Sequence, residues 1–320
     1  MMKEAIINFP KQFKWKPKVE GGKIKKYKRF VVCGMGGSHL GAGLLKTLLP
    51  DLDIVIHRSY GLPNLTEDSW KKRLVIASSY SGNTEETIEA FEAARAKKIP
   101  LAIIAAGGKL IELAKLHQIP FVQMPNTGIQ PRSALGFQLR GIAKLMKLSE
   151  ELKKSEALSK LNPESLEAKG RDLANLFKDK VPVIYASQSN RQIAYNWKIK
   201  FNETGKIPAF TNIFPELNHN EMTGFDVKES SRHLSEKFHF IFIKSSYDHP
   251  RILKRIEILE KLYKARGLEV TFVPMEGESL YYKIFNSLIL ADWTALYTAE
   301  LYGLESEQVP MVEEFKSLIA

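Results

Sequence analysis

Short apolar runs alternate with amphipathic segments through the first half of the chain. Each apolar run is short enough for a strand, and the segment after it has the spacing of a helix. The predicted strands are 29–37, 53–58, 73–79, 100–108 and 119–124, and the predicted helices are 40–49, 84–97, 109–117 and 133–148. Continuous apolar strands between amphipathic helices are typical of a parallel sheet with both faces covered. We therefore predict an α/β fold, a three-layer αβα sandwich.

A second series of the same kind occupies the rest of the chain. The predicted strands are 181–187, 239–246 and 268–275, and the predicted helices are 190–202, 250–266, 279–303 and a short one carrying Val312, Phe315 and Leu318. The polar stretch 149–165 separates the two series and reads as a linker or a connecting helix. Single cores rarely grow beyond about 250–300 residues. We therefore expect two domains, 1–150 and 151–320.

The composition is typical of a soluble globular protein. Its hydrophobic content is 44% and its charged content 26%. No apolar run approaches the roughly 20 residues that cross a bilayer, and the N-terminal residues lack the pattern of a signal peptide. Cys33 is the single cysteine, so no intramolecular disulfide can form. We expect a cytoplasmic protein with no membrane contact.

The formal net charge of +11 calls for a choice between partners. The densest basic run, 23–29, precedes the first predicted strand, and the other basic residues are scattered among acids. No helix-turn-helix, zinc-finger or RNA-recognition signature accompanies them. We expect a solvated lysine-rich surface and no nucleic-acid partner, and a basic field that attracts phosphorylated substrates is compatible with this.

The stretch SSYSGNTEE, 78–86, places four hydroxyl groups between a predicted strand and a predicted helix. Gly82 can adopt a backbone conformation closed to other residues. The start of a helix has unpaired N–H groups and a positive dipole end, which suit an anion. The alternative is that Ser81 or Asn83 is an ordinary N-cap. One cap needs one hydroxyl, so four favour a phosphate site.

The stretch GMGGS, 34–38, forms another strand-to-helix turn. Its glycines allow close backbone approach to a ligand, and Ser38 can donate to it. A dinucleotide fingerprint would require glycine at His39, and the Lys-Ser/Thr ending of a nucleotide P-loop is missing. In an open α/β sheet, turns at the carboxyl ends of strands face a shared crevice. The two turns together therefore predict one binding site.

Arg132, in the stretch QPRSALG, precedes a predicted helix. Its forked donor group suits an oxyanion beside a bound phosphate. An ordinary solvated arginine is the alternative, and the residues alone leave both open.

The densest polar segment is 198–221, which mixes amides and acids with Phe210, Phe214 and proline. Glu203 lies off the apolar helix stripe, near the helix end that Gly205 marks. The alternatives are a surface glutamate paired with Lys200 or Lys206, and a plain loop histidine at His219. Solvated loops seldom combine so many polar and aromatic residues, so a functional site is favoured. No His-Glu-x-x-His or Cys/His set is present, and we expect no metal.

Together these stretches, with NETGK..AF.N.FPELNHNE and the lysine of the final helix, resemble the bifunctional phosphoglucose/phosphomannose isomerases of the sugar isomerase (SIS) superfamily. The resemblance covers nearly the whole chain and implies two SIS-type subdomains. It implies that Arg132 stabilises an oxyanion, Glu203 transfers a proton, His219 opens the sugar ring and Lys316 is the family's C-terminal lysine. The residues that it implies for phosphate binding are Gly37, Ser38, Ser79, Ser81 and Thr84.

The chemistry implied is interconversion of glucose 6-phosphate and mannose 6-phosphate with fructose 6-phosphate. A carboxylate moves the proton between C1 and C2 through an enediolate, and an acid such as histidine first opens the ring. The phosphate fixes the position of the reacting carbons. We expect no cofactor, a small sugar 6-phosphate as ligand, and a homodimer with His219 acting across its interface. The alternatives are a non-catalytic sugar-phosphate sensor and an amino-sugar phosphate isomerase.

Overall fold

The computed structural model describes residues 2–319. The chain divides into two compact units, which we call the N-terminal unit (Asn8–Leu161) and the C-terminal unit (Met1–Ile7 with Asn162–Ala320). This division differs from the expected 1–150 and 151–320 at both ends. Met2 and Ile6 are buried within the C-terminal unit, where helix α1 (Met2–Ile7) packs on α12 (Leu280–Leu301). Arg140 binds Ser155 at 2.7 Å, which ties residues beyond 150 to the N-terminal unit.

The N-terminal unit is built on a parallel five-stranded sheet in the order β2-β1-β3-β4-β5. Its strands are β1 (Arg29–Cys33), β2 (Asp53–His57), β3 (Arg73–Ser78), β4 (Leu101–Ala105) and β5 (Phe121–Gln123). Its helices are η1 (Phe9–Lys14), η2 (Gly36–His39), α2 (Leu40–Leu48), α3 (Glu67–Trp70), α4 (Glu85–Ala96), α5 (Gly108–Leu116), η3 (Pro131–Ser133), α6 (Leu135–Leu145), α7 (Ser149–Glu156) and η4 (Ala157–Lys160). Every predicted strand and helix of this half is therefore present.

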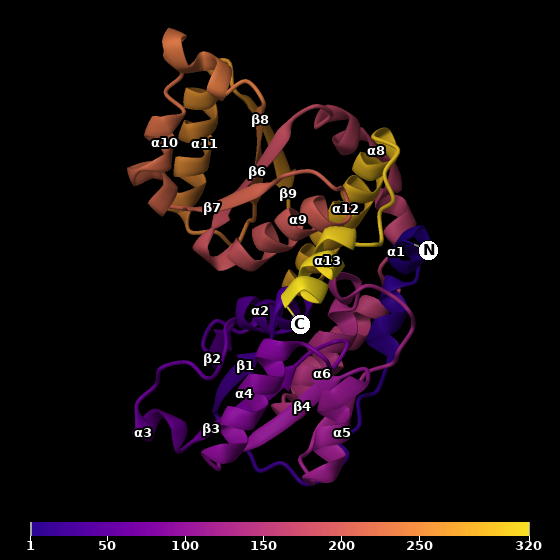
Figure 1. Ribbon diagram of the computed structural model, residues 1–320. Helices are drawn as coiled ribbons and strands as arrows, with labels where there is room; N and C mark the ends of the chain where they lie inside the picture. The colour runs from indigo at the N-terminus through magenta and orange to yellow at the C-terminus, as the bar shows by residue number, and fades with distance from the viewer. Residues whose placement is uncertain (1, 320) are drawn as a thin grey trace. The chain divides into compact units, whose positions relative to one another are not determined.

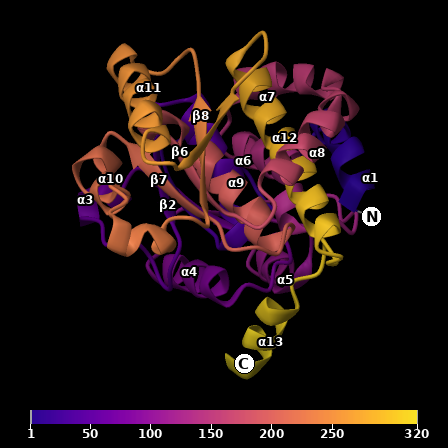
Figure 2. The same cartoon turned by 90° about the horizontal axis from the view of Figure 1, so that it is seen from above.

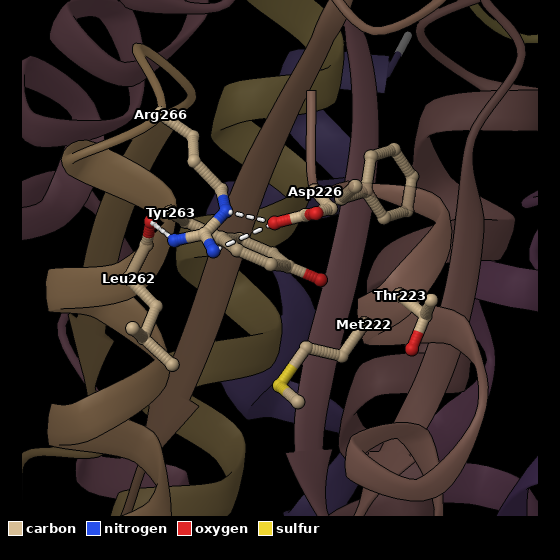
Figure 3. A pocket seen from close by; sticks show the side chains of 7 residues that line it. Met222, Thr223, Asp226, Leu262, Tyr263 and Arg266 are labelled. Carbon is tan, nitrogen blue, oxygen red and sulfur yellow. Dashed lines mark hydrogen bonds and ion pairs between the residues drawn. The ribbon is translucent and has the colours of Figure 1, made fainter. Parts of the chain in front are cut away.

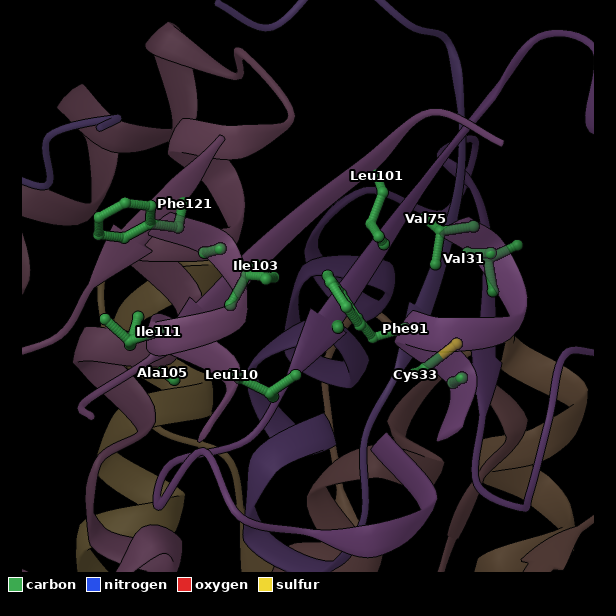
Figure 4. Close-up of a cluster of buried hydrophobic side chains, with 14 residues drawn as sticks. Val31, Cys33, Val75, Phe91, Leu101, Ile103, Ala105, Leu110, Ile111 and Phe121 are labelled. Carbon is green, nitrogen blue, oxygen red and sulfur yellow. The ribbon is translucent and has the colours of Figure 1, made fainter. Parts of the chain in front are cut away.

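Both faces of this sheet are covered. Helices α4 and α5 lie beside β3 and β4 (Figure 1), and α2 packs on α6, which contacts β4 and β5. Figure 4 shows the core under α4 and α5, where Phe91 and Leu110 meet side chains of the strands such as Val75 and Ile103. The apolar runs are continuous because strands buried on both faces need apolar side chains in both directions.

The C-terminal unit is built on a parallel four-stranded sheet in the order β7-β6-β8-β9. Its strands are β6 (Val181–Ser187), β7 (Phe210–Phe214), β8 (Phe238–Lys244) and β9 (Glu269–Pro274). Besides α1 and α12, its helices are η5 (Pro163–Leu166), α8 (Glu167–Leu176), η6 (Gln188–Asn190), α9 (Arg191–Glu203), η7 (Glu216–His219), α10 (Glu221–Gly224), η8 (Glu229–Leu234), α11 (Pro250–Lys264) and α13 (Pro310–Ile319). The α/β class is thus confirmed for both units.

Helix α11 covers one face of this sheet through Ile256, Leu259 and Tyr263. Helices α9 and α12 pack on each other, and α9 also contacts β6 and β7. Helix α13 stands apart from α12 in Figure 2, and its described residues after Pro310 are all exposed. No helix within residues 2–319 is long and apolar enough to cross a membrane.

Candidate active site

The turn between β3 and α4 gathers three hydroxyl groups. Ser79 is fully buried, and its Oγ lies 2.8 Å from Thr84 Oγ1 and 3.4 Å from Ser81 Oγ. The backbone N–H of Gly82 donates to the same Ser79 oxygen at 3.0 Å. Ser79, Ser81 and Thr84, which we call the hydroxyl cluster, thus occupy the N-terminal end of a 12-residue helix. Such an end favours negative charge.

Gly82 adopts a backbone conformation closed to other residues, as predicted. Its φ is +77°, in the left-handed region. A Cβ atom added there would lie 1.8 Å from the carbonyl oxygen of Gly107, because the turn after β4 approaches it closely. The N–H of Leu110 donates to the Gly82 carbonyl at 3.0 Å and holds the two turns together.

The hydroxyl cluster does not act as an ordinary helix cap. The N-cap of α4 is Thr84, whose side chain makes no capping hydrogen bond. The side chain of Asn83 accepts instead from the N–H of Lys109 at 2.9 Å, at the start of α5. Neither Ser81 nor Asn83 is therefore the plain N-cap of α4.

The glycine-rich turn after β1 contacts both the turn after β3 and the segment that carries Arg132. Ser38 Oγ accepts from the N–H of Tyr80 at 2.9 Å, and Ser78 Oγ donates to the Ser38 carbonyl at 2.7 Å. A Cβ on Gly37 would lie 2.8 Å from the backbone nitrogen of Arg132, so glycine allows this close approach. The N-terminal unit thus brings these three segments together.

Arg132 is 1% exposed, which excludes the alternative of a solvated surface arginine. A guanidinium is seldom buried unless its donors are used.

Next to the glycine-rich turn, His39 is also 1% exposed. Burial, with a smaller contribution from the Arg58 cation, lowers the pKa of His39 to about 4. The ring is therefore neutral at neutral pH, and its position beside Ser38 adds no positive charge.

Glu203 is the last residue of α9 in the C-terminal unit, and it is half-buried. The ammonium group of Lys206 donates to its backbone carbonyl at 2.7 Å. The alternative of pairing with Lys200 is not seen, because the Lys200 ammonium forms an ion pair with Asp292 of α12. The Lys206 contact with the Glu203 carbonyl and the ion pair of Lys200 with Asp292 both hold this end of α9.

His219 is exposed at the end of η7. The segment that carries it is attached to the sheet through Glu221, whose carboxylate accepts from the Tyr185 hydroxyl of β6 and the Asn212 amide of β7. Burial raises the pKa of Tyr185, so its hydroxyl stays protonated and donates. The segment that carries His219 is therefore held beside the sheet at both ends, by strand β7 before it and by the hydrogen bonds of Glu221 after it.

Lys316 lies on the exposed helix α13, and its ammonium nitrogen is 2.7 Å from Glu313 Oε1. Glu203, His219 and Lys316 therefore come from three different elements of the C-terminal unit. Within residues 2–319, no group of three His, Cys, Asp or Glu side chains is arranged to hold a metal ion.

A pocket of about 190 Å³ opens between α10 and α11, and its lining does not include Glu203, His219 or Lys316. Figure 3 shows its lining, in which Arg266 faces Asp226, with Nη2 2.6 Å from Oδ1. Lys228 lies 2.6 Å from the other oxygen, and the Lys228 and Arg266 cations together lower the pKa of Asp226. The Arg266 guanidinium that lines this pocket is therefore already paired with Asp226.

Sequence reasoning missed the contacts that hold these candidate residues. Tyr185 reads only as part of a buried strand, and its partner is 36 residues away. A partial signal exists for Lys200, because it follows Ile193 and Trp197 on the buried stripe of α9, where a charge demands a partner. Nothing in the local sequence identifies Asp292 as that partner.

Known proteins are similar in sequence to this chain over nearly its whole length. The family described as "Bacterial phospho-glucose isomerase C-terminal SIS domain" matches residues 166–319. The bifunctional phosphoglucose/phosphomannose isomerase of Aquifex aeolicus is 33% identical over 98% of this chain and 96% of its own length. The D-glucosamine-6-phosphate 4-epimerase of Sulfolobus acidocaldarius is 29% identical over 92% of this chain and 90% of its own.

Among solved structures, the glucosamine-6-phosphate deaminase of Thermotoga maritima matches with a TM-score of 0.67. It covers 97% of both chains at 14% sequence identity, which supports the fold alone. The identity to the Aquifex relative over almost the full length of both chains is the stronger result. The chain belongs to the bifunctional phosphoglucose/phosphomannose isomerase family of SIS-domain proteins.

Proposed function

We propose that this chain interconverts glucose 6-phosphate and mannose 6-phosphate with fructose 6-phosphate. The observation that carries the proposal is the hydroxyl cluster at the start of α4, in a chain that belongs to this isomerase family. Hydroxyls and backbone N–H groups at a helix start suit a phosphate group, which is the feature that the three sugars share.

Phosphate binding is assigned to the N-terminal unit. Ser79, Ser81 and Thr84 donate hydroxyl hydrogen bonds, and the glycine-rich turn adds Ser38 and the backbone of Gly37. The existing bonds among the hydroxyls keep the cluster in place before a ligand arrives. Binding energy gained at the phosphate then positions carbons that lie far from it.

Proton transfer is assigned to Glu203. Its carboxylate takes the proton from one of C1 and C2 and returns it to the other, and the enediolate is the intermediate. His219 delivers the proton that opens the cyclic sugar, with Lys316 as a second donor. The cation of Arg132 stabilises the negative oxygen of the enediolate. These steps balance without an oxidant, and we propose that no cofactor takes part.

Both aldose phosphates are substrates in this proposal. They differ only in configuration at C2, and the enediolate erases that difference. A site discriminates strongly only when the wrong sugar leaves one of its polar groups unpaired. Comparable turnover of both sugars therefore requires only that no group of the site forms a hydrogen bond specific to one configuration of the C2 hydroxyl.

Hexosamine 6-phosphates are the second candidate substrates, because the Sulfolobus relative named above is an epimerase of glucosamine 6-phosphate. Feeding glucosamine 6-phosphate beside fructose 6-phosphate separates the two possibilities. A non-catalytic sensor is the remaining alternative, and it predicts binding with no turnover of any of these sugars.

We also propose a cytoplasmic homodimer in which His219 acts on the substrate of the partner subunit. The exposed position of His219 supports this proposal. Light scattering of the purified protein tests the dimer directly.

The test of the chemical assignment is Glu203→Gln. This change removes the base and keeps the shape of the side chain, so we expect turnover to fall by at least about 1,000-fold. Binding of fructose 6-phosphate, followed by calorimetry, should stay within a few-fold. Substantial residual isomerisation would show that another residue acts as the base.

A further inference from the structure

An ion pair is buried in the interface between α9 and α12 of the C-terminal unit. Lys200 of α9 is 1% exposed and Asp292 of α12 is 6% exposed, and the ammonium group donates directly to the carboxylate. One turn earlier on α9, Trp197 Nε1 donates to Ser287 Oγ of α12 at 3.0 Å. Beyond the helix end, a Cβ on Gly205 would lie 3.5 Å from the carbonyl oxygen of Ala295. Three contacts in a row therefore set α9 against α12.

A buried ion pair gives little net stability to the packing of two helices. Removing two charges from water costs free energy, and their mutual attraction repays that cost only in good geometry. Apolar side chains of similar size are often as stable in such positions, or more so. Stability alone therefore does not explain why a lysine and an aspartate occupy this interface. A charge pair differs from an apolar contact because it has one favourable geometry, and it resists sliding of one helix along the other.

We infer that Lys200 and Asp292 are positioning residues for Glu203, an inference that rests on the proposed role of Glu203 as the base. Lys200 lies three residues before Glu203, so both are in the last turn of α9. The Lys200 carbonyl accepts from the N–H groups of Thr204 and Gly205, at 2.9 and 3.0 Å, and closes the helix directly behind Glu203. Lys200 is thus attached to α12 by its side chain and to the helix end by its backbone.

This arrangement matters because proton transfer is sensitive to distance. A base must lie within hydrogen-bond reach of the proton that it takes, and a displacement of about 1 Å can lower the rate about 100-fold. An apolar substitute for the pair would leave the helices packed but would let the end of α9 shift. Glu203 would then still be present, at a less productive distance from C1 and C2.

The experiment compares three variants with the unchanged protein. Lys200→Met combined with Asp292→Val replaces the pair by apolar side chains and leaves no buried charge. Ser287→Ala is the matched control, because it removes a buried contact between the same helices farther from Glu203. Glu203→Gln tests the role on which the inference rests. The assays are steady-state isomerisation of fructose 6-phosphate and thermal unfolding.

For the double variant we expect kcat to fall at least about 10-fold, with KM within about twofold and the melting temperature within a few degrees. Ser287→Ala should lower the melting temperature and leave kcat unchanged. A double variant with unchanged kcat would overturn the inference while sparing the proposed function, provided that Glu203→Gln is inactive. An active Glu203→Gln would overturn the proposed role of Glu203 and, with it, this inference.

A fourth variant keeps the test valid if the double variant does not fold. Asp292→Glu retains the charge and moves the carboxylate by one methylene, so the protein should fold while the ion pair pulls α9 to a new position. We expect a lower kcat at unchanged KM. Full activity in this folded variant would also overturn the inference.

Discussion

Replacing Gly82 by alanine tests the geometry of the proposed phosphate site. The added Cβ would lie 1.8 Å from the Gly107 carbonyl oxygen, far closer than any non-bonded contact, and the backbone φ of +77° is itself unfavourable for alanine. The conformation costs about 1–2 kcal/mol. Forcing two hydrogen-bonded backbone segments apart adds about 1–3 kcal/mol. We therefore expect a loss of about 2–5 kcal/mol in the free energy of unfolding.

Gly61→Ala is the matched control. Gly61 has a φ of +65°, and the nearest atom to its added Cβ is the flexible Glu89 carboxylate, at 3.8 Å. It should therefore show only the conformational cost of about 1–2 kcal/mol. Denaturant unfolding measures both variants, and calorimetry with inorganic phosphate measures binding. Gly82→Ala should also weaken phosphate binding at least about tenfold, because the turn that holds Ser79 must move. Equal stabilities and equal phosphate affinities of the two variants would refute the reasoning.

Three further predictions concern the hydroxyl cluster, a buried histidine and the proposed dimer. Thr84→Ala or Ser81→Ala should weaken binding of every 6-phosphate ligand, and unchanged affinity in calorimetry would reject the phosphate site. Because the pKa of His39 falls from 6.5 in the unfolded chain to about 4, the unfolded state binds more protons between these values. The buried ring should thus cost about 3 kcal/mol of stability as pH falls from 6.5 to 4, a loss that His39→Gln removes in denaturant unfolding. An identical pH dependence in that variant would contradict the burial argument. Mixing Glu203→Gln with His219→Ala should restore partial activity after subunit exchange, and proven exchange without activity would exclude action across the interface.

The sequence predicts most of the secondary structure, because short continuous apolar runs such as the strand that ends at Ser78 are typical of buried parallel strands. Strand β7 was missed, since Thr211 and Asn212 lie on an edge strand that is partly exposed and therefore carries no such run. The placement of Met2 and Ile6 in the C-terminal unit also escaped prediction. That placement depends on contacts with α12, nearly 300 residues later, and no local pattern encodes them.

Some features of the candidate site could likewise be predicted from the sequence and others could not. The sequence predicts that Gly82 adopts a backbone conformation closed to other residues, and its positive φ confirms this. The residues alone left open whether Arg132 is a solvated arginine or one that faces an oxyanion, and its burial excludes the first alternative. The ion pair of Lys200 and Asp292 was beyond prediction, since it joins residues 92 positions apart through the packing of two helices.

The most direct test of the central claim is a single NMR experiment on the purified protein. Fructose 6-phosphate is incubated with the protein in deuterated water containing a chelator, and the sugar signals are followed with time. The account predicts that glucose 6-phosphate and mannose 6-phosphate both form at comparable rates and that part of each product carries deuterium at C2, because some of the protons held by the carboxylate exchange with solvent before they are returned. Formation of neither aldose, or of both without any deuterium, would contradict the proposed isomerase chemistry.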